Sequence, residues 1–178
     1  MRRGRPRSMT GPMTRTLIAV AAAAVASTLV PARALADERS IIRAPGDHTP
    51  YIFEAEPHLL LGYAGPFEEG DNFGVGFRGT IHITDGFVKS INDSVGIGFG
   101  FDIGTHNRIL IPVVMQWNFW LSTHWSVFGE PGIAIGSGRD TQAWPVLDVG
   151  GRFLFTERIA LTMRLGFPAA SVGVSFFL

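Results

Sequence analysis

Apolar and polar residues alternate along much of the chain from Phe53 to the last residue. In the stretch Ser94–Ile103 every second residue is valine, isoleucine or phenylalanine, and the residues between them are glycine, serine and aspartate. The stretches Asn72–Ile83 and Ile159–Phe167 repeat this pattern. A period of two is typical of β-strands with one apolar face. These three stretches are therefore predicted strands.

Weaker alternation predicts further strands, and no amphipathic helix of convincing length separates them. These stretches are Phe53–Gly65, Ile109–Leu121, Trp125–Ile135, Pro145–Phe155 and Ala169–Leu178. The fold expected is all-β, an eight-stranded antiparallel up-and-down transmembrane β-barrel. Because Pro57, Pro112 and Pro131 cannot donate a backbone hydrogen bond, we expect bulges or ragged strand ends near them.

The alternation alone does not say which face points inward. A soluble calycin-type barrel buries its apolar face, whereas a membrane barrel turns that face to lipid. Here the polar faces carry mostly glycine, serine, threonine and asparagine with isolated charges. Such faces suit a narrow lumen better than a solvated surface, which favours the membrane barrel. A soluble periplasmic β-barrel that binds an apolar ligand remains the alternative.

The first 36 residues have the features of a cleaved signal peptide. Basic residues precede the apolar run Leu17–Val30, and the small residues of Ala34–Ala36 offer a cleavage site. The run has 14 residues, fewer than the roughly 20 that a membrane-spanning helix needs. Residues 37–52, rich in turn-forming and charged residues, are expected to form a short flexible periplasmic lead-in before the barrel at 53–178.

Removal of residues 1–36 changes the charge balance. Six of the 15 basic residues and none of the 15 acidic residues lie in that segment, so the remaining chain has a net charge of −6. This charge does not favour nucleic-acid binding. The chain has no cysteine, which excludes a disulfide framework and a thiolate metal site.

Turn-forming residues and aromatic residues fit this topology. The expected outer connections are Gly65–Asp71, Gly104–Asn107, Gly136–Ala143 and Pro168–Ala170, and the expected periplasmic ones are Thr84–Asp93, Ser122–His124 and Thr156–Arg158. Thr84–Asp93 is unusually long for a periplasmic turn. Two groups of aromatic residues suit the two membrane interfaces: Trp117, Phe119, Trp120 and Trp125 at one end, and Tyr63, Phe67, Phe73 and Trp144 at the other.

The lumen of an eight-stranded barrel is narrow enough to be filled by side chains, so a wide pore is not expected. The inward positions collect nine ionisable residues: Glu54, Glu56, His58, Arg78, Asp102, Glu130, Asp148, Arg152 and Arg164. Buried charges need partners. We therefore expect a cross-lumen network at mid-height made by Arg78, Glu130, Asp148, Arg152 and Arg164. It either stabilises a polar core or lines a narrow ion path.

Signals for chemistry are weak. His124 and Ser126, with Glu130 four residues further on, resemble the His-x-Ser pair and glutamate of some outer-membrane lipid A deacylases, but the glutamate is some 13 Å along an extended strand from the serine. The five histidines lack the spacing of metal ligands. We expect no enzymatic activity, no cofactor and no bound metal.

The signal, the strands from Phe53 to Leu178 and the closing sequence SVGVSFFL resemble the small outer-membrane β-barrel families, namely the OmpA-like transmembrane domain and its opacity-type relatives. The resemblance implies the outer membrane of a Gram-negative bacterium, contact with its lipid, and recognition by the barrel-assembly machinery. The assembly signal would be the outward face of the last strand, Val172, Val174, Phe176 and Leu178. A monomer with a structural or surface role is expected.

Overall fold

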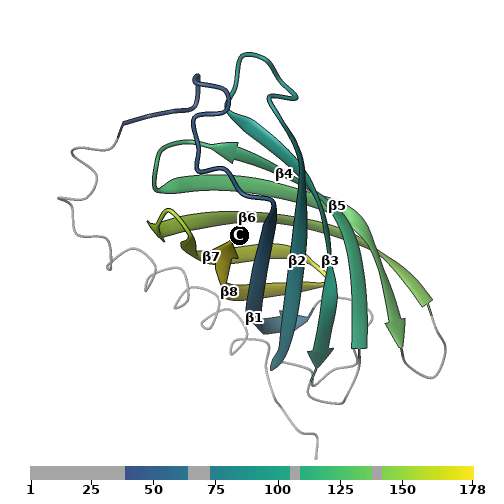
Figure 1. The fold of residues 1–178 in the computed structure, drawn as a ribbon. Helices are drawn as coiled ribbons and strands as arrows, with labels where there is room; N and C mark the ends of the chain where they lie inside the picture. The colour runs from purple at the N-terminus through teal and green to yellow at the C-terminus, as the bar shows by residue number, and fades with distance from the viewer. Residues whose placement is uncertain (1–38, 64–72, 105–108, 138–141) are drawn as a thin grey trace, which may run out of the picture. The chain divides into compact units, whose positions relative to one another are not determined.

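A computed structural model describes residues 39–63, 73–104, 109–137 and 142–178. Eight strands form a closed barrel in which each strand pairs antiparallel with its neighbours in sequence and β1 pairs with β8 (Figure 1). The strands are β1 (Phe53–Tyr63), β2 (Phe73–Asp85), β3 (Asp93–Gly104), β4 (Ile109–Trp120), β5 (Trp125–Ser137), β6 (Gln142–Thr156), β7 (Ile159–Phe167) and β8 (Ala169–Phe177). The predicted fold class is therefore confirmed.

Some predictions cannot be compared with the described part of the chain. The signal at residues 1–36 lies outside the described residues, and so do most of the three longer outer connections. Within the described ranges, no helix has the length and apolar character needed to cross a membrane.

The alternation along each strand separates an apolar outer face from a polar lumen. Every strand exposes large apolar side chains on the outside, among them Leu59, Val75, Ile97, Ile111, Ile133, Leu147, Leu165 and Val174. The residues between them are buried inside the barrel and include most of its charged side chains. The side of each strand that faces inward therefore carries the polar residues, as the sequence predicts for a membrane barrel.

The prolines inside strands do not cause the bulges expected of them. The register of each strand stays constant past Pro57, Pro112 and Pro131. Both N–H and C=O of an antiparallel residue point to the same neighbouring strand. Each proline therefore interrupts the hydrogen-bond ladder with one neighbouring strand only and pairs normally with the other. The interrupted neighbour is β8 for Pro57, β3 for Pro112 and β4 for Pro131. The register shifts lie close to strand ends instead, at Leu61/Tyr63, His82/Thr84 and Leu154/Thr156.

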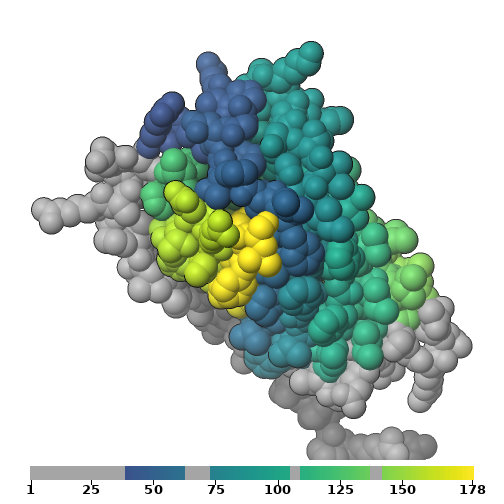
Figure 2. Space-filling view, viewed as in Figure 1, coloured from purple at the N-terminus to yellow at the C-terminus, as the bar shows by residue number. Residues whose placement is uncertain are grey.

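The start of β1 and the end of β8 lie at the same end of the barrel, which we call the terminal mouth. Backbone N–H groups of Ile52 and Phe53 both donate to the carbonyl oxygen of Leu178, at 2.7 and 3.1 Å. Figure 2 shows the last strand, in yellow, next to the dark blue first strand. We call the opposite end the loop mouth.

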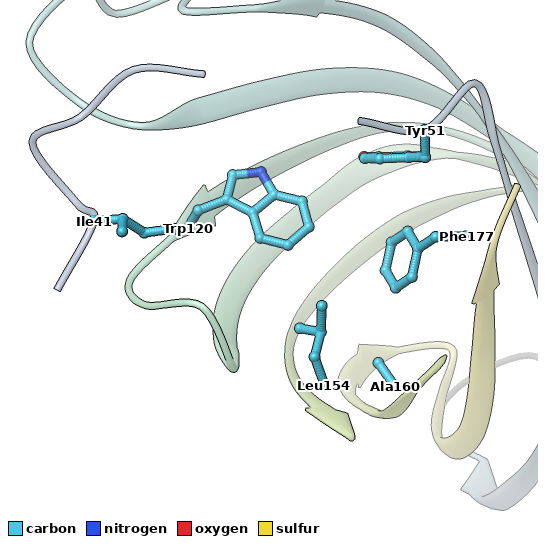
Figure 3. Close-up of a cluster of buried hydrophobic side chains, with 6 residues drawn as sticks. All are labelled: Ile41, Tyr51, Trp120, Leu154, Ala160 and Phe177. Carbon is cyan, nitrogen blue, oxygen red and sulfur yellow. The ribbon is translucent and has the colours of Figure 1, made fainter. Parts of the chain in front are cut away.

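The segment Arg39–Ile52, expected to be flexible, packs across the terminal mouth. Ile41 and Tyr51 from this segment are buried against Trp120, Leu154, Ala160 and Phe177 (Figure 3). Ile41 N–H donates to Leu121 O at 3.1 Å, and Ser40 pairs with Ser122. The prediction of a flexible lead-in was therefore wrong. The segment is anchored by only two apolar residues, Ile41 and Tyr51, and two such residues give no periodic pattern in the sequence.

The long connection between β2 and β3 holds this segment in place. Asn92 N–H donates to Ile42 O at 2.8 Å, and its side chain accepts from Gly46 N–H and donates to Asp47 O. Asn92 is fully buried. The length of this connection, unusual for its end of a barrel, therefore has a structural cause.

The aromatic residues divide between the outer face and the lumen. Trp117 and Phe119 contact each other on the outer face with tilted rings, and Trp125 contacts Phe153 in the same way. The girdle prediction was wrong for Trp120, which is buried inside the terminal mouth, and for Trp144, which packs on buried residues in the lumen. The even-numbered residues of β4 and β6 face the lumen, so the alternation along these strands turns Trp120 and Trp144 inward.

Candidate functional site in the barrel lumen

All nine ionisable residues at the predicted inward positions are buried. The layer nearest the terminal mouth contains Arg152 of β6 and Glu54 of β1. Arg152 Nε donates to Glu54 Oε1 at 3.0 Å and a second guanidinium nitrogen donates to Glu54 Oε2 at 2.8 Å. The third nitrogen bonds the side-chain oxygen of Asn118. This bidentate geometry leaves neither charge uncompensated.

A second layer is centred on Arg164 of β7. Its guanidinium binds Glu56 on β1 and Glu130 on β5, with 2.8 Å between Nε and Glu130 Oε2. Glu130 also accepts from Arg78 at 3.2 Å and from the Gln116 amide at 2.7 Å. Five side chains from five strands therefore tie opposite walls of the barrel together.

Phe128 of β5 lies between the two layers. The guanidinium carbon of Arg152 is 4.2 Å from the centre of its ring, and that of Arg164 is 5.1 Å away. This spacing fits cation–π contact on the ring. Gly150 makes room for Phe128, because a Cβ atom at Gly150 would lie 2.1 Å from the ring. The aromatic ring therefore fills the lumen where the two arginine layers meet.

His58, Asp102 and Asp148 lie on the side of the second layer that faces the loop mouth. His58 Nε2 is 2.8 Å from Asp102 Oδ1. Asp148 Oδ1, His58 Nδ1 and Arg78 Nε are buried and have no hydrogen-bond partner among the described residues. They surround a cavity with room for about one water molecule.

Beyond this cavity the lumen becomes apolar. Leu110, Val114, Ala134 and Val146 form a buried cluster, and Trp144 packs against it. This cluster, the two arginine layers and the packed terminal mouth occupy the lumen in succession. The described residues leave no wide passage along the barrel axis.

The predicted mid-height network is divided in the structure. Glu130, Arg78 and Arg164 come together, whereas Arg152 belongs to the layer nearer the terminal mouth and Asp148 forms no ion pair with a described residue. The partners that sequence reasoning left out of the network are Glu54 and Glu56. Their inward position could be predicted, but the strand stagger that brings β1 opposite β6 and β7 could not.

The candidate catalytic residues do not come together. Ser126 Oγ is buried in the lumen and has no hydrogen-bond partner in the described part of the chain. His124 lies exposed in the turn before β5, and its ring stacks on the outward Phe153. Glu130 is occupied by two arginines and a glutamine. His124 and Ser126 therefore do not share a face, because His124 belongs to the turn before β5 and not to the strand itself.

Two other histidines meet at the terminal mouth. His48 Nε2 and His82 Nε2 lie 2.9 and 2.8 Å from the same oxygen, Asp85 Oδ1. The centres of the two imidazole rings are 6.4 Å apart. Among the described residues, no three histidine, aspartate or glutamate side chains are arranged to share a metal ion.

The predicted assembly-signal residues all lie on the outer side of the barrel, Val172, Val174 and Phe176 in β8 and Leu178 directly after it. Val174, Phe176 and Leu178 are exposed and Val172 is partly exposed, whereas Phe177 between them is buried in the lumen. Their register position is thus as expected. Their role in assembly stays a prediction.

Comparison with known proteins supports the fold. No family model matches the chain, and a search of curated protein sequences finds no match. Two de novo designed transmembrane β-barrels are similar in structure. One is 12% identical, with a TM-score of 0.54 over 74% of this chain and 99% of its own, and the other, TMB2.3, is 9% identical, with a TM-score of 0.55 over 75% and 98%.

A natural outer-membrane protein is also among the similar structures. Ail of Yersinia pestis, in a phospholipid bilayer nanodisc, is 11% identical, with a TM-score of 0.44 over 70% of this chain and 99% of its own. The matches to the designed barrels show that this chain has the fold of an eight-stranded transmembrane β-barrel.

Proposed function

We propose that the protein is an integral outer-membrane β-barrel with a structural or surface role and a closed lumen that does not conduct ions. The observation that carries this proposal is the combination of an apolar outer face on all eight strands with a charged, hydrogen-bonded interior. Lipid is the environment in which such an apolar outer face is stable, and a closed barrel exposes no strand edge to it.

The soluble alternative requires the opposite arrangement. A periplasmic barrel that carries an apolar ligand would have an apolar lumen and a charged outer face. Here the lumen contains three arginines and their carboxylate partners, and the large apolar side chains exposed on the strands are mostly valine, leucine, isoleucine and phenylalanine. These observations favour the membrane barrel.

In the proposed setting, the partners are outer-membrane lipid and, during biogenesis, the barrel-assembly machinery. The protein acts as a monomer, without cofactor or catalytic activity. The resemblance to OmpA-like and opacity-type barrels supports a Gram-negative outer membrane, and the alternating outward face of β8 supports recognition by the assembly machinery.

Fractionation tests the location. We expect the full chain, expressed in a Gram-negative host, to sediment with the outer membrane and to migrate differently on gels before and after boiling. Release by osmotic shock would contradict the membrane proposal.

Planar-bilayer recordings test the lumen separately. We expect no single-channel steps from the purified, folded protein. Regular conductance steps from the unaltered protein would refute the closed lumen but leave the membrane location intact.

A further inference from the structure

The long connection between β2 and β3 presents an aromatic side chain to the outside of the barrel. Phe87 is 69% exposed, and its ring meets that of Trp117 with 5.6 Å between the ring centres and the planes inclined by 84°. Trp117 in turn contacts Phe119 on the outer face of β4. These three aromatic side chains therefore continue the apolar outer face to the end of the barrel at the terminal mouth.

A buried aspartate fixes the position of Phe87. The carboxylate of Asp93 accepts from Val88 N–H at 3.1 Å and from the indole N–H of Trp117 at 2.8 Å. Gly86 N–H donates to the carbonyl oxygen of Asp93 at 2.9 Å. The residues on both sides of Phe87 are thus bound to Asp93, which also binds the indole ring against which Phe87 packs. The outward position of Phe87 is therefore built into the connection.

The Arg39–Ile52 segment lies beside this connection at the terminal mouth (Figure 1). A surface hollow of about 470 Å³ is lined by two residues of the segment, Ile42 and Arg43, and by two of the connection, Ser90 and Ile91. Ile42 is exposed and Ile91 is half-buried. The hollow therefore combines apolar side chains with one guanidinium and one hydroxyl group.

Two basic side chains of these elements have no acidic partner. Arg43 and Lys89 are exposed and form no ion pair with a described residue. The acidic residues of the segment and of the connection are already engaged: Asp47 lies 3.8 Å from Arg39, Asp85 contacts two histidines, and Asp93 has the donors named above. The group that complements this surface is therefore an anion, although residues 37–178 together have a net charge of −6.

We propose that Ile42, Arg43, Phe87, Lys89, Ser90 and Ile91 form a headgroup surface, which binds an anionic phospholipid of the leaflet at the terminal mouth. The acyl chains lie along the aromatic side chains of the outer face, and the phosphate diester occupies the hollow. There the Arg43 guanidinium and the Ser90 hydroxyl donate to phosphate oxygens, and Lys89 adds positive charge beside Ser90. This inference rests on the proposed function, in which the terminal mouth lies at the inner, phospholipid leaflet.

The two unpaired cations set the size of the expected preference. A lysine or arginine near an anionic membrane surface favours that surface by roughly fivefold. With Arg43 and Lys89 together, we expect an anionic lipid to be bound roughly tenfold or more tightly than a zwitterionic lipid with the same acyl chains at low salt. Because both side chains are exposed, salt should screen the attraction and reduce this preference.

Native mass spectrometry of the full, folded protein measures the preference. The protein is supplied in detergent with equal amounts of phosphatidylglycerol and phosphatidylcholine that have the same acyl chains, and the lipid molecules that stay bound are counted. We expect one phosphatidylglycerol per protein, roughly tenfold more often than one phosphatidylcholine. Equal retention of the two lipids would overturn the headgroup surface.

Matched variants assign the preference to particular side chains. The double variant Arg43→Gln with Lys89→Gln should lose it, whereas Lys89→Arg, which keeps the charge, should retain it. Arg158→Gln, at an exposed position in the turn between β6 and β7, should bind lipid as the parent does. A preference that persists in the double variant would overturn the site. Dimers that form in place of the lipid complex would assign the surface to a second copy of the chain and overturn it as well.

A nitroxide at position 87 tests contact with the acyl chains. The chain has no cysteine, so Phe87→Cys and, as a control, Arg158→Cys each give a single attachment site. In phosphatidylcholine vesicles that contain phosphatidylglycerol, the label at 87 should be relaxed more by oxygen, which concentrates in lipid, than by a water-soluble nickel chelate, and the label at 158 should show the reverse. Equal access of the chelate to both labels would overturn the headgroup surface and leave the membrane barrel intact. Failure of the unaltered protein to insert into the vesicles would contradict the proposed membrane location itself.

Discussion

The pair formed by Glu54 and Arg152 allows a sharp test of how charges stabilise the lumen. Both side chains are at most 1% exposed, and two hydrogen bonds of 2.8 and 3.0 Å join them. Removal of one member of a buried pair leaves the other charge without a partner, which costs about 3–5 kcal/mol. We therefore expect Glu54→Gln to lower the free energy of unfolding by about that amount.

The two members of the pair should not be equivalent. In Glu54→Gln the guanidinium of Arg152 stays charged because it cannot lose its proton, whereas in Arg152→Met the carboxyl of Glu54 can become neutral by taking up a proton. Arg152→Met should therefore cost less than Glu54→Gln. The loss of free energy of unfolding in the double variant should be smaller than the sum of the two single losses, because no unpaired charge then stays buried.

Urea-induced unfolding in lipid vesicles, followed by tryptophan fluorescence, measures these free energies. Gel migration without boiling measures the folded fraction independently. Arg158→Gln, at an exposed position in the turn between β6 and β7, is a matched control and should be within about 0.5 kcal/mol of the parent. Single variants that each cost less than about 1 kcal/mol, or a double variant that costs the full sum, would refute the argument.

Three further predictions concern the lumen, the outer face and the last strand. Gly150→Ala should lower the folded yield severely, because its Cβ would lie 2.1 Å from the Phe128 ring, while Gly151→Ala, with its nearest neighbour at 3.8 Å, should fold normally; equal yields on unboiled gels would contradict this packing. Val113→Arg, on the outer face of β4, should cost about 2–4 kcal/mol in vesicles, and a neutral effect on urea unfolding would count against lipid contact there. Deletion of Phe176–Leu178 should abolish membrane insertion, as measured by fractionation, and normal insertion would mean that these residues do not carry the assembly signal.

The strands and their faces were accessible from the sequence because a period of two is a local property. The predicted stretch Ile159–Phe167 coincides with β7, and the inward positions of Glu54 and Arg152 followed from the same period. Their pairing was not accessible. It depends on the stagger between strands that are distant in sequence, 98 residues apart in this case, and alternation within each strand carries no information about that stagger.

The ends of the barrel were harder to predict for a different reason. At the terminal mouth, the segment around Ile41 and Tyr51 has no period, and its contacts with Trp120 and Asn92 come from parts of the chain far away. His48 and His82 looked unrelated in sequence and meet only because this segment folds back over β2. The contacts of a segment without a periodic pattern can be identified only from the tertiary structure.

The hydrogen bonds of Leu178 constrain the order in which the molecule is completed. The carbonyl group of this last residue accepts from both Ile52 and Phe53, so the place where the segment meets β8 exists only after the final strand has joined the first. The Arg39–Ile52 segment therefore cannot reach its full set of contacts on an unfinished barrel. During folding, the amides of this segment should therefore become protected from hydrogen exchange only after the barrel has closed with all eight strands in register.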